Sequence, residues 1–105
     1  MAFVRLIEAS GCGRERGVFV AHEEFELVVF RLGEDEFVVA DNACPHASGN
    51  LSGGEVSHGV VTCPWHEWQF DVRAGACVHS DKAKLTRYPV EVREGWVFAE
   101  LVRPY

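Results

Sequence analysis

The sequence predicts an all-β fold, an antiparallel sandwich or barrel that carries one inserted subdomain. Short apolar runs rich in Val and Phe recur along the chain with turn residues between them, and little of the chain has helical spacing. The insertion is indicated by residues 42–58, which contain few apolar side chains and are too long for an ordinary hairpin loop.

The strands are expected in the following order along the chain. In the first half, the segments that alternate between apolar and polar residues, or that are continuously apolar, are 3–8, 17–21, 25–32 and 36–41. In the second half they are 59–63, 68–72, 85–92 and 95–102. Gly33-Glu34-Asp35 and Arg93-Glu94-Gly95 lie between consecutive runs and are expected to form tight turns.

The 105 residues are expected to form a single domain, with a base of about 1–40 and 76–105 and an insertion of about 41–75 that carries Cys and His residues. The sequence contains no run of about 18 apolar residues, so no membrane span is expected. The N-terminus is interpreted as a first strand rather than a signal peptide, which favours a cytoplasmic location.

The chain carries a net charge of −6, which argues against nucleic acid as a partner because phosphate binding needs clustered Lys and Arg. Two interpretations of the acidic balance remain open. It can keep the protein soluble, or it can form an acidic face that docks on a basic partner.

The strongest functional signal is "CPHASGNLSGGEVSHGVVTCPWH", which places Cys44 and His46 in one short loop and Cys63 and His66 in another. A single zinc ion is one interpretation, but structural zinc sites usually pair like ligands at each end. Residues two apart in extended chain lie roughly 6.5 Å apart, which suits two metal atoms better than one. A Cys–His nucleophile is a third interpretation, although no orienting third residue can be named.

A dinuclear iron–sulfur cluster explains the mixed loops best. If each loop bridges two irons, both cysteines can meet on one iron and both histidines on the other. This is the ligand set of a Rieske [2Fe–2S] centre.

The segments "CPHASGNL" and "CPWHEWQFDVRAG" resemble the two cluster-binding boxes of Rieske-type ferredoxins, and "LTRYPVEVREGWVFAEL" is similar to their closing hairpin. The resemblance extends from about residue 38 to 101, and it implies a Rieske-like β sandwich or barrel in which the insertion 41–75 is the cluster-binding subdomain. It implies one [2Fe–2S] cluster per chain, with Cys44 and Cys63 on the inner iron. It implies His46 and His66 on the outer iron, which takes the electron.

The resemblance also implies a function. We expect a one-electron carrier, not an enzyme, that passes electrons from a flavin-dependent reductase to a terminal oxygenase. The alternative is the small subunit of an NADH-dependent nitrite reductase, with the large subunit as its partner. A remote alternative is a zinc-stabilised binding module without redox activity.

The positions at which respiratory-chain members carry a disulfide are Gly49 and Trp65 here, and the position of their hydrogen-bonding serine is Trp68. Fewer donors to the cluster predict a potential in the lower half of the Rieske range. Glu67 stands where the family usually has glycine, and residues 79–85 lack the proline of the family's third loop.

Five further residues carry expectations about structure rather than about ligands. Cys12 and Cys77 match no ligand position and are expected to be small, partly buried thiols. Phe70 is expected in the core. Gly53 and Gly54 are expected to let the long loop turn tightly.

Overall fold

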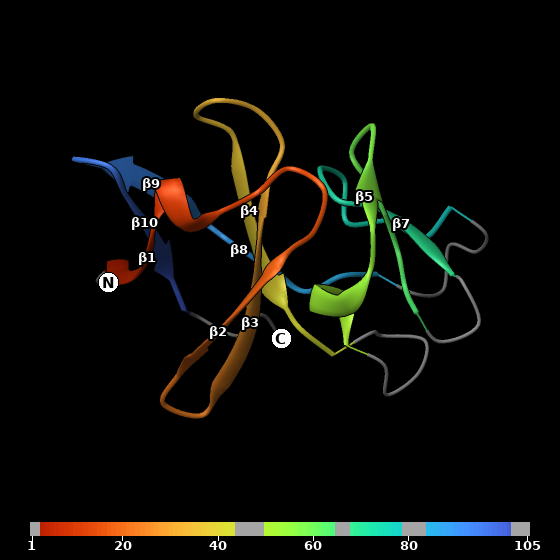
Figure 1. Ribbon diagram of the computed structural model, residues 1–105. Helices are drawn as coiled ribbons and strands as arrows, with labels where there is room; N and C mark the ends of the chain where they lie inside the picture. The colour runs from red at the N-terminus through yellow and green to blue at the C-terminus, as the bar shows by residue number, and fades with distance from the viewer. Residues whose placement is uncertain (1–2, 44–49, 65–67, 79–83, 102–105) are drawn as a thin grey trace.

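The computed structural model describes residues 3–43, 50–64, 68–78 and 84–101 (Figure 1). Within these residues every strand pairing is antiparallel and helix is limited to two single 3-10 turns, which confirms the all-β prediction. The elements are β1 (Phe3–Glu8), η1 (Ala9–Gly11), β2 (Val18–His22), β3 (Phe25–Arg31), β4 (Phe37–Asp41), η2 (Leu51–Gly53), β5 (Val56–Ser57), β6 (Val60–Thr62), β7 (Gln69–Asp71), β8 (Arg87–Tyr88), β9 (Val90–Arg93) and β10 (Trp96–Glu100).

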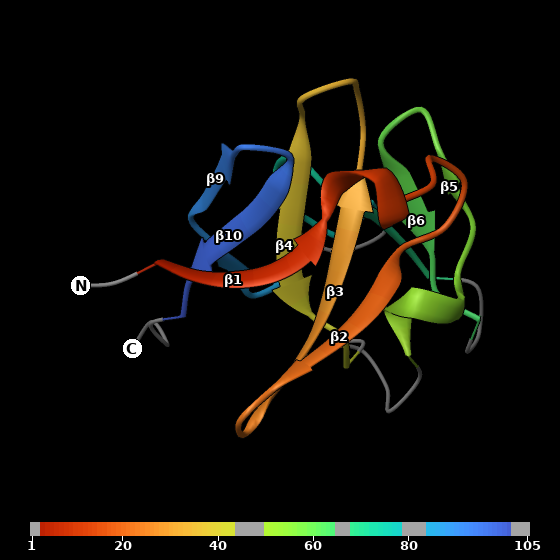
Figure 2. The ribbon, with the colours of Figure 1, turned by 60° about the vertical axis from the view of Figure 1, so that its left-hand side comes forward.

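The described strands form three sheets, with the orders β1-β10-β9, β2-β3-β4-β8 and β5-β6-β7. Figures 1 and 2 show the four-stranded sheet in the middle, with β1, β9 and β10 on one side of it and β5, β6 and β7 on the other. The structure is therefore layered around the central sheet.

Strand β3 explains why the central sheet is covered on both faces. Its apolar run is continuous, and Leu27, Val28, Val29 and Phe30 are all buried. Because successive side chains of a strand point to opposite faces, Leu27 and Val29 join one hydrophobic core and Val28 and Phe30 join the other. A run without polar alternation is the pattern expected of a strand buried on both faces.

The core between the central sheet and β5-β6-β7 fixes the position of the small sheet and of Cys63. Leu51, Val61, Cys63 and Phe70 are wholly buried there against Val28 and Phe30 of β3 and Ala40 of β4. The burial of Phe70 confirms the expectation from the sequence. The small sheet is thus packed directly on the rigid centre of the domain.

Strand β5 was not expected, because it lies in the stretch of low apolar content. It pairs with β6 through a two-residue turn, His58-Gly59, in which both residues have positive φ, 53° and 76°. Paired left-handed residues suit the twist of a hairpin, and the second of them is the glycine. The long region is therefore partly a hairpin rather than a continuous loop.

The expected strand 85–92 is divided at Pro89. Tyr88 of β8 pairs with Val39 in the central sheet, whereas Val92 of β9 pairs with Val97 in the other sheet. Proline has no N–H to donate to a strand partner, so the chain changes sheets where the ladder is interrupted anyway.

The sheet β5-β6-β7 falls within the predicted insertion 41–75, and strands β1–β4 and β8–β10 fall outside it. The division into base and insertion stays a prediction. Among the described residues, no helix is long and apolar enough to cross a membrane.

Candidate metal centre

Of the four predicted ligands, Cys63 is the one that the structure describes. Cys44, His46 and His66 lie outside the described residues, as do Glu67 and residues 79–83. Cys63 follows β6 directly and its side chain is wholly buried in the core of the small sheet. Within the described ranges no three His, Cys, Asp or Glu side chains gather in a metal-binding group.

The loop that follows Cys63 is closed at its base by backbone hydrogen bonds. Thr62 pairs with Gln69, and the Cys63 N–H donates to the Trp68 carbonyl oxygen at 2.7 Å. Because Phe70 is buried one residue further along β7, this base is fixed to the core. Cys63 therefore begins its loop from a rigid position.

The segment that contains Cys44 and His46 is closed in a similar way. Ala43 and Asn50 form an antiparallel bridge, and the Leu51 N–H donates to the Asn42 carbonyl oxygen at 2.8 Å. Asn42 is itself buried, with 3% of its surface exposed. The chain thus leaves β4 and returns to η2 across one hydrogen-bonded base.

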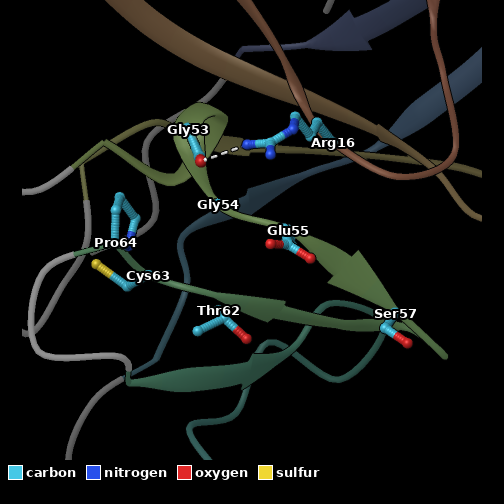
Figure 3. A pocket seen from close by; sticks show the side chains of 8 residues that line it. All are labelled: Arg16, Gly53, Gly54, Glu55, Ser57, Thr62, Cys63 and Pro64. Carbon is cyan, nitrogen blue, oxygen red and sulfur yellow. Dashed lines mark hydrogen bonds between the residues drawn. The ribbon is translucent and has the colours of Figure 1, made fainter.

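The bases of the two predicted ligand loops touch each other (Figure 3). A Cβ built on Gly54 would lie 2.0 Å from the Thr62 carbonyl oxygen, and one built on Gly53 would lie 3.8 Å from Pro64 Cγ. Each predicted loop carries one Cys and one His, so the fold brings the chain just after the first loop against the start of the second.

The two glycines contribute differently from what the sequence suggested. Neither glycine has positive φ. The described glycines with positive φ are Gly59, Gly75 and Gly95. Gly54 is required because its missing side chain lets η2 lie against Thr62. Close approach rather than a tight turn accounts for that residue.

A pocket of about 460 Å³ opens beside these bases (Figure 3). Its lining residues are Arg16, Gly53, Gly54, Glu55, Ser57, Thr62, Cys63 and Pro64. Arg16 Nη1 donates to the Gly53 carbonyl oxygen at 3.0 Å, and the Val56 N–H donates to the Glu15 carbonyl oxygen at 2.7 Å. These bonds attach η2 and β5 to the segment that precedes β2.

The residues before 79–83 attach to β7, and those after it attach to the turn that follows β7. The Val78 N–H donates to the Gln69 carbonyl oxygen at 2.8 Å, Phe70 bridges Cys77, and Ala76 bridges Lys84. Val78 is 56% exposed, which makes it one of two large apolar side chains at the surface of the described residues. The third predicted loop therefore starts from the same small sheet as the second.

The two remaining cysteines are more deeply buried than expected. Cys12 is 4% exposed and Cys77 is 7% exposed, each within a hydrophobic core. Burial raises the pKa of the Cys12 thiol, and the charge of Arg31 opposes that shift. Cys12 therefore stays protonated in the fold.

Sequence reasoning did not single out Asn42 or Arg16, although both hold the loop bases. A lone Asn after an apolar run indicates only a turn, and a lone Arg indicates an exposed charge. Neither pattern reveals a partner distant in the sequence, so no local signal could have found these contacts.

The fold and the joined loop bases define a small all-β domain in which the bases of two segments, each carrying one Cys and one His, lie in contact. The family model of the Rieske [2Fe-2S] domain matches residues 4–89. The chain therefore belongs to the Rieske [2Fe–2S] domain family, whose cofactor is a [2Fe–2S] cluster. This confirms the family and the cofactor expected from the sequence, while the identity of the four ligands stays a prediction.

Two curated relatives illustrate the range of similar proteins. The chain is 34% identical over 82 residues to the ferredoxin component of the alkene monooxygenase system of Xanthobacter autotrophicus, covering 69% of this chain and 67% of that one. It is 39% identical over 84 residues to methylxanthine N1-demethylase NdmA of Pseudomonas putida, covering 72% of this chain and 24% of that one. The chain thus spans about a quarter of the demethylase's length.

Solved structures agree with the fold. A ferredoxin of Sphingomonas yanoikuyae B1 superposes with a TM-score of 0.87 at 27% identity, covering 96% of this chain and 100% of that one. A ferredoxin–oxygenase complex of carbazole 1,9a-dioxygenase gives 0.87 at 27% identity, covering 98% and 96%. A structure provisionally described as the small subunit of a nitrite reductase gives 0.83 at 20% identity, covering 96% and 100%, which shows a shared fold alone.

The residues present fit the family's cofactor. Cys63 supplies a thiol, a soft ligand suited to iron–sulfur clusters, and it sits at the rigid end of β6. Cys44, His46 and His66, the other predicted ligands, would provide the remaining donor types that a Rieske centre uses.

Proposed function

We propose that this protein is a one-electron carrier that delivers electrons to an oxygenase-type acceptor, and is not itself an enzyme. The observation that carries the proposal is the contact between the bases of two loops, each holding one Cys and one His. Relatives that are ferredoxin components of oxygenase systems support it. A flavin-dependent reductase is the donor that we expect.

In this proposal Cys44 and Cys63 bind one iron, and His46 and His66 bind the other. When bound, the [2Fe–2S] cluster supplies reversible one-electron chemistry. The chain contributes a fixed and dry attachment, because Cys63 lies in a core with Leu51 and Phe70 and is wholly buried. Rigid ligand attachment limits the structural change that accompanies electron transfer.

The acceptor class is supported by the carbazole 1,9a-dioxygenase complex, in which a ferredoxin of similar structure is bound to an oxygenase. The nitrite reductase alternative is supported by a shared fold. Mixing the reduced protein with a purified oxygenase and following cluster reoxidation optically would separate the two. The cytoplasmic location expected from the sequence stays a prediction.

The cluster itself is tested by EPR of the dithionite-reduced protein, with iron and sulfide counted on the same sample. We expect about two irons per chain and a rhombic signal with average g below 2. Cys63→Ser should lose both. Cys77→Ser is the matched control, because Cys77 is buried in the same core and is not a predicted ligand, so it should keep both. About one zinc per chain and a silent spectrum would favour the binding module instead.

We also propose a midpoint potential in the lower half of the Rieske range of roughly −150 to +300 mV. Gly49 and Trp65 stand where other members carry a disulfide, so that bridge is absent, and Trp68 stands in place of a hydroxyl donor. Fewer dipoles directed at the cluster stabilise the reduced state less. Protein-film voltammetry that gave a value above about +150 mV would contradict this reasoning.

A further inference from the structure

Asn42 is the one buried polar or charged side chain among the residues that the structure describes, with 3% of its surface exposed. It lies directly after β4 and two residues before Cys44. A buried amide is costly unless its donors and acceptors are satisfied, so its hydrogen bonds define what it contributes.

The backbone of Asn42 makes two of these bonds. Its N–H donates to the Glu26 carbonyl oxygen at 2.9 Å, and its own carbonyl oxygen accepts from the Leu51 N–H at 2.8 Å. The first bond ties the end of β4 to the neighbouring strand β3. The second ties it to the first residue of η2.

The side chain makes two more bonds, both to the far end of the same segment. Asn42 Oδ1 accepts from the Ser52 N–H at 2.9 Å, and Asn42 Nδ2 donates to Asn50 Oδ1 at 3.3 Å. Asn suits this arrangement because one amide both accepts and donates, whereas Asp at neutral pH could only accept. The side chain therefore joins Asn42 to Asn50 and Ser52, and the backbone carbonyl joins it to Leu51 between them.

The segment held in this way is also connected to the second ligand loop. Leu51 is wholly buried in the core that contains Cys63, and Gly54 lies against Thr62. A shift of residues 50–52 relative to β4 would consequently alter the distance between the two loop bases.

We propose that Asn42 is a positioning residue for the cluster, which fixes the base of the segment carrying Cys44 and His46 relative to Cys63. This inference depends on the proposed function. Asn42 is not itself a predicted ligand, and it acts through Asn50, Leu51 and Ser52.

The test compares Asn42→Ala with Val97→Ala in the cluster-loaded protein. Val97 is wholly buried in the other core, so its truncation should lower the melting temperature without touching the loop bases. We measure iron release to a chelator, the reduced EPR spectrum and the midpoint potential. In Asn42→Ala we expect iron release about 10-fold faster or more, with altered g values and a shifted potential. In Val97→Ala all three should match wild type.

Two milder variants keep the test decisive if Asn42→Ala does not fold. Asn42→Asp retains the acceptor for the Ser52 N–H and should lie between Asn42→Ala and wild type. Asn50→Ala removes only the partner of Nδ2 at an exposed position, and should change iron release in the same direction but less.

Wild-type iron release and spectra in Asn42→Asp and Asn50→Ala would overturn the inference, as would equal changes in Val97→Ala. A wild-type protein that holds no cluster would instead overturn the proposed function and this inference together.

Discussion

Replacing Gly54 by alanine should loosen the contact between the two predicted ligand loops. The added Cβ would lie 2.0 Å from the Thr62 carbonyl oxygen, and ordinary contact begins at 3.4 Å, so η2 and β6 must separate by about 1.4 Å. The obstructing atom belongs to backbone and cannot rotate away. Overpacking of this kind costs about 1–3 kcal/mol.

A second effect opposes this cost. Gly54 has φ −87° and ψ 153°, which alanine adopts without strain, and Gly→Ala then stabilises by about 0.4–1 kcal/mol through the unfolded chain. With a steric cost of about 2 kcal/mol and a gain of about 0.7 kcal/mol, we expect a net loss of about 1.3 kcal/mol. For a domain of this size the melting temperature should fall by about 5–10 °C.

Thermal unfolding followed by circular dichroism measures the change, and Gly53→Ala is its matched control. A Cβ on Gly53 would meet Pro64 Cγ at 3.8 Å, which is ordinary contact, so the melting temperature of Gly53→Ala should equal that of wild type or slightly exceed it through the same unfolded-chain effect. A Gly54→Ala protein as stable as wild type would refute the reasoning, because the loop bases would then not be in the contact described.

Three further predictions concern stability. Tyr88→Phe removes the hydroxyl that donates to Asp41 Oδ1 at 2.7 Å, and should cost about 1.5 kcal/mol in urea unfolding; no measurable change would contradict that bond. The exposed Glu36–Arg73 ion pair lowers the pKa of Glu36 below its ordinary 4.5, so its stabilisation is complete above pH 4.5 and is lost as pH falls through the lowered pKa. Glu36→Gln should therefore be less stable than wild type at pH 7 but equal to it in strong acid, and 1 M NaCl should shrink the difference at pH 7; a gap that persists in acid would argue for another cause. Burial raises the pKa of Cys12 above 9.0, so the neutral thiol stabilises the fold below pH 9.0 and that contribution declines as pH rises towards the raised value. The stability of Cys12→Ala should fall less steeply than that of wild type above pH 9.0, and parallel pH profiles would oppose this assignment.

Much of the fold could be predicted because its signals are local. The run at 25–32 forms β3, and its unbroken apolar character corresponds to burial on both faces. The Glu94-Gly95 turn forms as expected, with positive φ at both residues. These features depend on neighbouring residues, which a sequence displays directly.

Other features depended on signals that were present but were outweighed. His58-Gly59 is a hairpin turn, yet the polar residues around it favoured a loop. Pro89 separates two strands that belong to different sheets, although the apolar residues on either side suggested a single strand.

The contacts around the candidate site show what local sequence signals do not reveal. The sequence supports a prediction of the cofactor from motif spacing, whereas the contact between Gly54 and Thr62 and the bonds of Asn42 could not be predicted from it. Such contacts join residues through the tertiary fold, and nothing in the local pattern specifies them.

The pairing of the first and last described strands has a consequence for how this kind of domain is used. Phe3 of β1 lies opposite Glu100 of β10, so the chain enters and leaves side by side, in the layer separated from Cys63 by the central sheet (Figure 2). A domain with adjacent entry and exit can be grafted into a larger polypeptide through two neighbouring junctions without disturbing its opposite side. The same architecture can therefore serve as a detachable shuttle or as a built-in module, and the match to about a quarter of a longer demethylase is consistent with both uses.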